Sequence, residues 1–64
     1  MQYELTIESE VCDTITIYPH TREGLTAAFA RISKARTKVG FECARIVSDR
    51  DGEVFVLDNN LISA

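Results

Sequence analysis

The chain has 64 residues, of which 45% are hydrophobic and 27% charged, which is the composition of a folded globular domain rather than a disordered segment. A chain this short forms one domain, over residues 1–64, with a core so small that self-association or a partner would add to its stability. No apolar run approaches the roughly 18 residues of a membrane span. The amino-terminal segment also lacks the basic and then apolar pattern of a signal peptide, so we expect a cytoplasmic protein that makes no membrane contact.

The formal net charge of −3 is distributed unevenly along the chain. All charged side chains of residues 1–19 are acidic, and residues 39–64 are acidic in balance. Residues 20–38, by contrast, carry five basic side chains against one acidic side chain. The sequence therefore predicts a basic helix beside an acidic sheet, a polarity that would orient a charged partner as it approaches.

Two amino-terminal segments alternate apolar and polar residues and predict a first β-hairpin. Opposed residues of an antiparallel pair share a face, so Leu5 must oppose Ile15 if both apolar sets are to face the core. This pairing requires a loop of three or five residues centred on Glu10. The other face is then acidic and rich in hydroxyl groups, and it carries Glu4, Thr6, Glu8, Thr14, Thr16 and Tyr18. That face is either plain solvated surface or a contact surface for a basic partner, with Tyr18 as the aromatic anchor.

The segment from His20 to Gly40 predicts the only helix of the chain, over about residues 21–38. Thr21 caps its first turn and Gly40 supplies a left-handed stop. Gly24 is unfavourable inside a helix and marks either a close backbone approach or nothing. The apolar stripe consists of Leu25, Ala28, Phe29, Ile32 and Val39, with the stem of Arg36 packed along the same side.

The opposite face of this helix carries a basic ridge formed by Arg31, Lys34 and Lys38. The plain interpretation is the solvated side of an amphipathic helix. The functional interpretation is nucleic-acid binding, in which each neutralised phosphate would steepen the salt dependence by about one unit of slope. The pI of about 4.9 and the absence of a helix-turn-helix pair or an aromatic stacking pair count against it.

The segment after Gly40 predicts a second hairpin, whose turn contains an Asp-Gly pair at positions 51–52. Pairing Ile46 with Phe55, and Ala44 with Leu57, places the bulkiest residues of both strands on one face, which we assign to the core. The opposite face is also apolar and lies on the side that one helix cannot cover. It holds Phe41, Cys43, Val47, Val54 and Val56 around Arg45.

This second apolar face is the most informative feature of the sequence. Small domains seldom leave contiguous valines in water without a partner, so the face predicts a protein interface. Two competing interpretations remain open. The carboxyl-terminal Leu61 and Ile62 cover the face, or the core and outer faces of the hairpin are exchanged.

Residues with catalytic or metal-binding chemistry are few and poorly spaced. Cys12, His20 and Glu23 could act as nucleophile, base and orienting group only if the hairpin tip met the start of the helix. Two cysteines and one histidine lack the paired spacing of a zinc site, and the acidic turn around Asp51 lacks the register of a calcium loop. We expect no enzyme activity, no cofactor, no metal, and free thiols at Cys12 and Cys43.

Together these patterns predict a two-layer α+β domain of the order β-β-α-β-β, with an antiparallel four-stranded sheet and one helix packed on one face. The predicted strands lie at about residues 2–8, 13–18, 41–48 and 53–58. The predicted function is a small non-enzymatic protein-binding module, an adaptor or a stoichiometric inhibitor. Its partner is another protein or, in a homodimer, a second copy, bound through the outer face of the second hairpin. Nucleic-acid binding through the basic ridge is the second choice, and no small-molecule substrate is expected.

Overall fold

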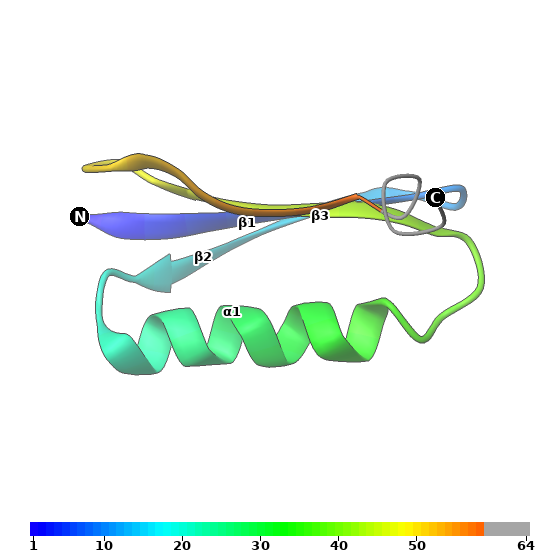
Figure 1. Cartoon of the computed structure of the whole chain (residues 1–64), viewed down its shortest axis with the longest axis horizontal. Coiled ribbons are helices and arrows are strands. Elements are labelled where there is room, and N and C mark those ends of the chain that lie inside the picture. The colour runs from blue at the N-terminus through cyan, green and yellow to red at the C-terminus, as the bar shows by residue number, and fades with distance from the viewer. Residues whose placement is uncertain (59–64) are drawn as a thin grey trace.

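The computed structural model describes residues 1–58 and has two layers, a four-stranded antiparallel sheet and one helix on one of its faces (Figure 1). In chain order the elements are β1 (Gln2–Ser9), β2 (Asp13–Pro19), α1 (Arg22–Ala35), β3 (Phe41–Ser48) and β4 (Gly52–Asp58). The predicted β-β-α-β-β arrangement of the α+β class is therefore confirmed. The helix of this part of the chain is too short and too polar to cross a membrane.

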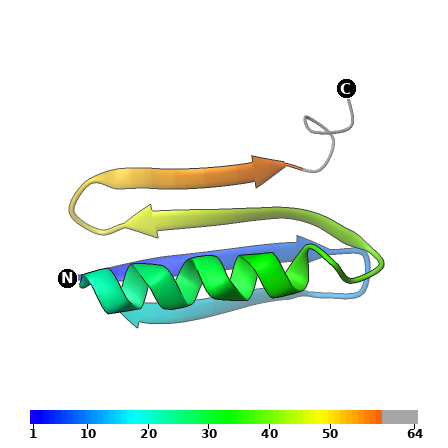
Figure 2. The same ribbon diagram turned by 60° about the horizontal axis from the view of Figure 1, so that its bottom comes forward.

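The strands lie in the order β2-β1-β3-β4, so the first strand of the chain is a central strand of the sheet. Because β1 is antiparallel to both neighbours, β2 and β3 run parallel to one another on its two sides. The helix joins these two parallel strands and packs against β2, β1 and, least extensively, β3. Figure 2 shows that α1 lies over the β1–β2 half of the sheet, whereas β4 extends beyond it.

The first hairpin differs from the sequence expectation by one residue in register. Leu5 pairs with Thr16 rather than with Ile15. Four residues, 9–12, lie between the last pair of this hairpin, Glu8 and Asp13, and among them the Ser9 hydroxyl binds both backbone groups of Cys12. It accepts from the N–H at 3.2 Å and donates to the carbonyl oxygen at 2.7 Å. The predicted loop of three or five residues is therefore wrong.

A shift of one residue turns every side chain of β2 over. Tyr18 pairs with the buried Tyr3 and packs against the core on the helix side, whereas Ile15 and Ile17 point away from the helix. The predicted position of Tyr18 as an exposed anchor on the face away from the helix is therefore wrong. The shift brings the largest side chain of β2 into the core and leaves its two isoleucines outside.

The helix begins as predicted. The Thr21 hydroxyl oxygen accepts from the backbone N–H of Gly24 at 3.0 Å, which confirms the cap. A Cβ atom at Gly24 would overlap the carbonyl oxygen of Pro19 and would lie 3.0 Å from its carbonyl carbon. Gly24 therefore marks a close approach between the first turn of the helix and the end of β2.

The helix ends at Ala35, earlier than predicted. The Thr37 hydroxyl donates to a carbonyl of the last helical turn at 2.8 Å, and the chain turns there. Val39, predicted to lie in the apolar stripe, is instead 98% exposed. Arg36, whose stem was predicted to pack along the stripe, is the C-cap residue and is exposed. Gly40 has the expected positive φ of 91°, but it serves the turn into β3 rather than the helix stop.

The predicted core face of the second hairpin is confirmed. Ile46 lies opposite Phe55 and Ala44 opposite Leu57, and Ala44 and Ile46 are completely buried. The interpretation in which the two faces of this hairpin are exchanged is thereby excluded. The ring of Phe29 on α1 also reaches Phe55 in an edge-to-face contact, with the centroids 4.9 Å apart.

Two irregularities move residues from their predicted positions. Continuing the Ile46–Phe55 pairing by one residue would place Val47 opposite Val54. Val47 lies opposite Glu53 instead, because the register shifts next to the turn that contains the positive-φ Gly52. Phe41 lies at the second irregularity, between β1 and β3, and is buried in the core. The predicted position of Phe41 on the outer face is therefore wrong.

Candidate functional site

The sheet face that points away from α1, here called the outer face, has no element of residues 1–58 packed over it. Opposed residues of the antiparallel pairs place its side chains in rows that cross the strands in the order β2, β1, β3, β4. The rows are Ile17-Glu4-Val47-Glu53, Ile15-Thr6-Arg45-Val56 and Asp13-Glu8-Cys43-Asp58. Aliphatic side chains thus occupy the β2 edge of the first two rows and the β4 edge of the second, and three of the four residues in the third row are acidic.

Four aliphatic side chains of the two edge strands are exposed. Ile15 and Ile17 of β2 are 63% and 48% exposed, and Val54 and Val56 of β4 are each 41% exposed. Sequence reasoning predicted the two valines but missed the isoleucines, because it assigned the wrong register to β2. The signal that could have found them is Ser9, whose side chain determines the loop length.

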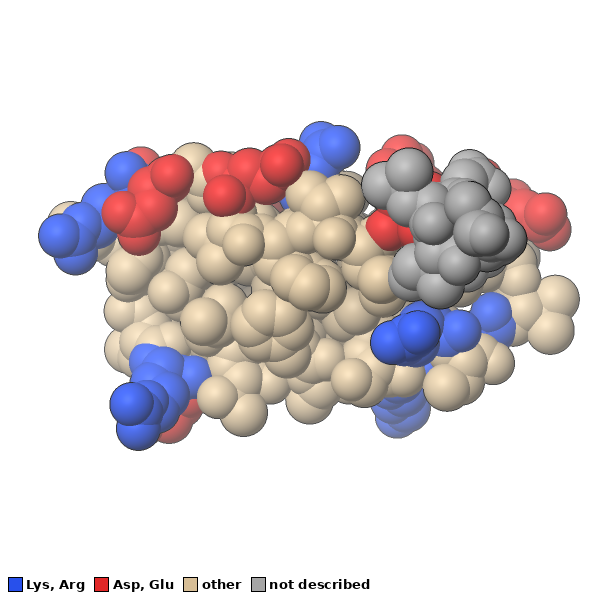
Figure 3. Space-filling model, in the orientation of Figure 1, with Lys and Arg blue, Asp and Glu red and all other residues tan. Residues whose placement is uncertain are grey.

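The outer face is strongly acidic. It carries five carboxylates against one guanidinium, that of Arg45, whose Nε lies 3.3 Å from Glu53 Oε2. Both members of this ion pair are more than half exposed, so the pair adds little stability. Figure 3 shows the acidic groups gathered along the sheet layer, whereas the basic groups of the helix lie on the other side of the molecule.

The Cys43 thiol is held by a carboxylate. Its Sγ donates to Glu8 Oε2 at 2.8 Å. The pKa of Cys43 is raised from 9.0 to about 11. The largest cause is this hydrogen bond, and burial of the thiol and the negative charge of Glu8 contribute less. A thiol with such a pKa is protonated at neutral pH and is a poor nucleophile, so Cys43 belongs to the packing of this face rather than to chemistry.

The predicted interface residues divide into two groups. Cys43, Arg45, Val47 and the two valines of β4 lie on the outer face, where Cys43 and Val47 are half-buried. Phe41 and Tyr18 do not, because both belong to the helix side of the sheet. The interpretation that Leu61 and Ile62 cover the face falls outside the described residues.

The predicted basic ridge lies on the exposed surface of α1. Arg31, Lys34 and Lys38 are all exposed and form no ion pair with any side chain of residues 1–58. They line a shallow hollow of about 180 Å³ together with Ala35. The structure thus brings the three cations together around one small residue.

Sequence reasoning missed a polar cluster at the corner between β2 and α1. The His20 ring stacks on Tyr3, with centroids 4.4 Å apart, and its Nε2 lies 3.1 Å from Ser48 Oγ and 3.6 Å from Asp51 Oδ2. Ser48 is only 2% exposed, and its oxygen accepts from the backbone N–H groups of Arg50 and Asp51. The cluster connects the second hairpin to the start of the helix.

This Ser-His-Asp grouping lacks the geometry of a nucleophilic triad. Ser48 Oγ accepts from two backbone N–H groups of the turn and lies 3.1 Å from His20 Nε2, so its position is fixed by the turn that it closes. Asp51 approaches the same ring nitrogen as the serine rather than the opposite one, which is the position an orienting carboxylate needs. The serine therefore anchors the turn and is not placed to attack a substrate.

The other predicted chemical groupings are not assembled. Cys12 and His20 lie at opposite ends of β2, so the imagined grouping with Glu23 does not form. Both cysteines are free, as expected, and Cys12 is exposed. Over residues 1–58, no three His, Cys, Asp or Glu side chains are placed to hold a metal ion. Comparison with models of known protein families, with curated proteins and with solved structures finds no match.

Proposed function

We propose that this protein is a small non-enzymatic protein-binding module, an adaptor or a stoichiometric inhibitor, that holds its partner on the outer face of the sheet. The observation that carries the proposal is the exposure of four aliphatic side chains, on both edge strands, over a face with no described element against it. The two aliphatic pairs flank a central strip that contains Glu4, Thr6, Arg45 and Val47, so a partner that spans the face would contact both pairs and bury apolar surface that the described residues leave exposed.

The charge of the outer face indicates the chemistry of the partner. Five carboxylates against one guanidinium, that of Arg45, favour a partner that presents lysine or arginine side chains to this face together with aliphatic groups that contact its two edges. A homodimer through this face would bring the carboxylates of two copies together. We therefore favour a basic protein over a second copy, and self-association through this face should require low pH or high salt.

Serine substitutions at Ile15 and Val56 test the proposal. Each side chain is about half exposed, so its burial by a partner is worth roughly 1 kcal/mol, or about fivefold in Kd. We expect the double variant to lose about 25-fold in affinity for a protein captured from the host lysate, with little loss of folding stability. The control is Val11→Ser, which removes an exposed valine from the hairpin tip.

Two measurements decide the outcome. Affinity capture with wild-type and variant chains shows whether retention depends on the outer face and weakens with salt. Light scattering at several protein concentrations measures self-association. The proposal is wrong if the captured proteins bind the double variant as tightly as the wild type, or if Val11→Ser has the same effect.

Nucleic-acid binding through the basic ridge remains the second candidate. It is favoured by the clustering around Ala35 of three cations that form no ion pair within residues 1–58. Lys34→Glu should then abolish a gel shift of duplex DNA or RNA at low salt. If the wild-type protein does not retard duplex DNA or RNA under those conditions, this candidate is removed.

A further inference from the structure

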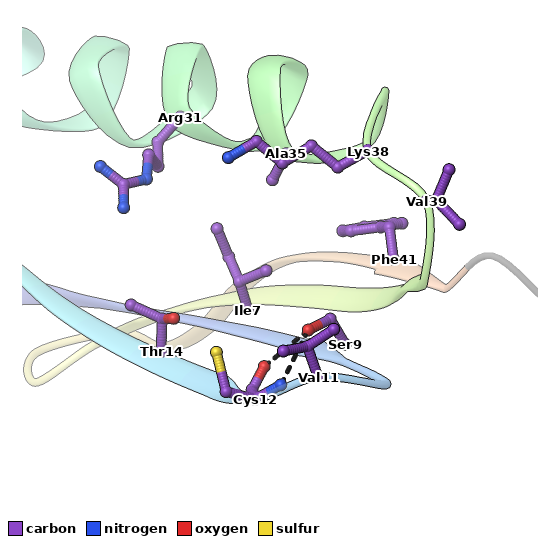
Figure 4. A pocket seen from close by; sticks show the side chains of 10 residues that line it. All are labelled: Ile7, Ser9, Val11, Cys12, Thr14, Arg31, Ala35, Lys38, Val39 and Phe41. Atoms are coloured by element: carbon purple, nitrogen blue, oxygen red, sulfur yellow. Dashed lines mark hydrogen bonds between the residues drawn. The ribbon is translucent and has the colours of Figure 1, made fainter.

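A cavity of about 280 Å³ lies between the carboxyl-terminal half of α1 and the tip of the β1–β2 hairpin (Figure 4). Ile7 and Phe41 project into it from the sheet side, and Ala35 lines it from the helix. The hydrogen bond from the Glu10 N–H to the Gly40 carbonyl oxygen, at 2.9 Å, joins the hairpin tip to the turn after the helix. The cavity therefore has an apolar interior, and the hairpin tip and the turn after the helix, which border it, are held together by a backbone hydrogen bond.

Two cations stand over this apolar interior. Arg31 and Lys38 extend from the helix side along the cavity, and neither forms an ion pair within residues 1–58. The described lining contains no carboxylate at all, although the chain as a whole has ten acidic side chains against seven basic ones. Lys34 adds a third positive charge in the adjoining hollow.

The polar groups on the hairpin side contribute little charge to the cavity. The Ser9 hydroxyl is engaged by both backbone groups of Cys12 and is not available to a ligand. Thr14 and Cys12 point toward the cavity from β2 and the loop before it. The cavity thus has an apolar interior and a cationic rim. These two features complement a molecule that is apolar over most of its length and anionic at one end.

We propose that this cavity binds a small amphipathic anion, an alkyl or aryl carboxylate whose apolar body packs on Ile7, Ala35 and Phe41. The carboxylate then lies between Arg31 and Lys38, and Arg31 can donate two parallel hydrogen bonds to it. The volume lies just under the range of about 300–1,000 Å³ that is typical of small-molecule sites, so the ligand is smaller than a drug-sized molecule. The site lies on the helix side of the sheet and is independent of the outer face.

Octanoate, below its micellar concentration, is a suitable probe. A titration followed by ¹⁵N–¹H NMR should shift the amide signals of Ile7, Ala35 and Phe41 in a saturable way. Octanol has the same apolar body without the charge, and it should bind at least about tenfold more weakly because it loses the charge-assisted contacts. Sulfate, which has charge without an apolar body, should leave these signals unchanged.

Three variants locate the binding. Lys38→Gln should weaken octanoate binding about tenfold, and Ala35→Leu should abolish it by filling the cavity. Arg22→Gln is the matched control and should have no effect, since Arg22 is an exposed cation at the other end of α1 that forms no ion pair with the described part of the chain. The NMR spectrum of each free variant reports whether it is folded.

The proposal is overturned by any of three results: octanol binds as tightly as octanoate, Arg22→Gln weakens binding as much as Lys38→Gln, or folded Ala35→Leu still binds. The absence of any saturable shift with octanoate also overturns it. None of these results bears on protein binding by the outer face, so the two proposals fail separately.

Discussion

Replacing Gly24 with alanine sets two physical effects against each other. Alanine is the better helix former, and in a helix interior the change would stabilise the protein by about 1 kcal/mol. The added Cβ, however, would overlap the Pro19 carbonyl oxygen and lie 3.2 Å from the Pro19 ring. The sign of the effect therefore tests whether this close approach is present.

The steric effect should win. The atom that must yield is backbone, and it is held in place because the Pro19 carbonyl oxygen accepts from the Thr21 N–H at 2.8 Å. Overpacking of this kind costs about 3 kcal/mol, so after the propensity gain we expect a net loss of about 2 kcal/mol. For a chain of this size, such a loss lowers the Tm by roughly 8–16 °C.

Urea unfolding followed by circular dichroism measures the difference, with the slope of the transition as a check that only stability has changed. Ala30→Gly is the control, because Ala30 is exposed on the same helix and should lose about 1 kcal/mol from propensity alone. If Gly24→Ala instead raises the free energy of unfolding by about 1 kcal/mol, the close approach to Pro19 does not exist.

The remaining predictions concern the hydrogen bonds of three side chains, those of Cys43, Ser48 and Thr21. With its pKa raised from 9.0 to about 11, Cys43 should react roughly tenfold more slowly with a thiol reagent near pH 8 than an ordinary thiol, because a thiolate fraction about 100-fold smaller is partly offset by the greater nucleophilicity of a more basic thiolate. Glu8→Gln should restore most of this rate while leaving Cys12 unchanged. Because the folded chain holds this proton more tightly, the stability it contributes is complete below about pH 9 and is lost as the pH rises toward 11, which urea unfolding at several pH values can follow. Ser48→Ala removes the acceptor of two backbone N–H groups and should cost about 1–3 kcal/mol; an unchanged urea midpoint would contradict that role. Thr21→Ala should cost about 1 kcal/mol in the same assay, and Thr21→Ser should recover most of it, since both hydroxyls cap the helix.

Much of the fold was predictable because its signals are local. The helix start depends on a cap and a periodic stripe within one segment, and the core face of the second hairpin follows from the pairing of Ile46 with Phe55 and of Ala44 with Leu57. Gly24 illustrates a signal that the sequence could only leave open. The low helix propensity of glycine at this position can be read from the sequence, but only the position of the Pro19 carbonyl group explains why glycine is needed there.

The outer face was predicted only in part, because one strand register cannot be read from alternation alone. In β2 the threonines and Tyr18 alternate with isoleucines, and a pattern of β-branched residues on both faces fits either orientation. The loop hydrogen bonds of Ser9 decide between them. The cavity beside Arg31 could not be predicted, since it requires the hairpin tip and the end of the helix to be neighbours.

The central place of β1 has a consequence for how the molecule assembles. Leu5 pairs on one side with Thr16, close in the chain, and on the other with Ile46, near its far end. During synthesis β1 therefore keeps one edge unpaired until β3 has left the ribosome, and an open strand edge is a site of aggregation. Closing that long loop is entropically expensive, so the pairing of β1 with β3 is the step expected to limit the rate at which the sheet is completed.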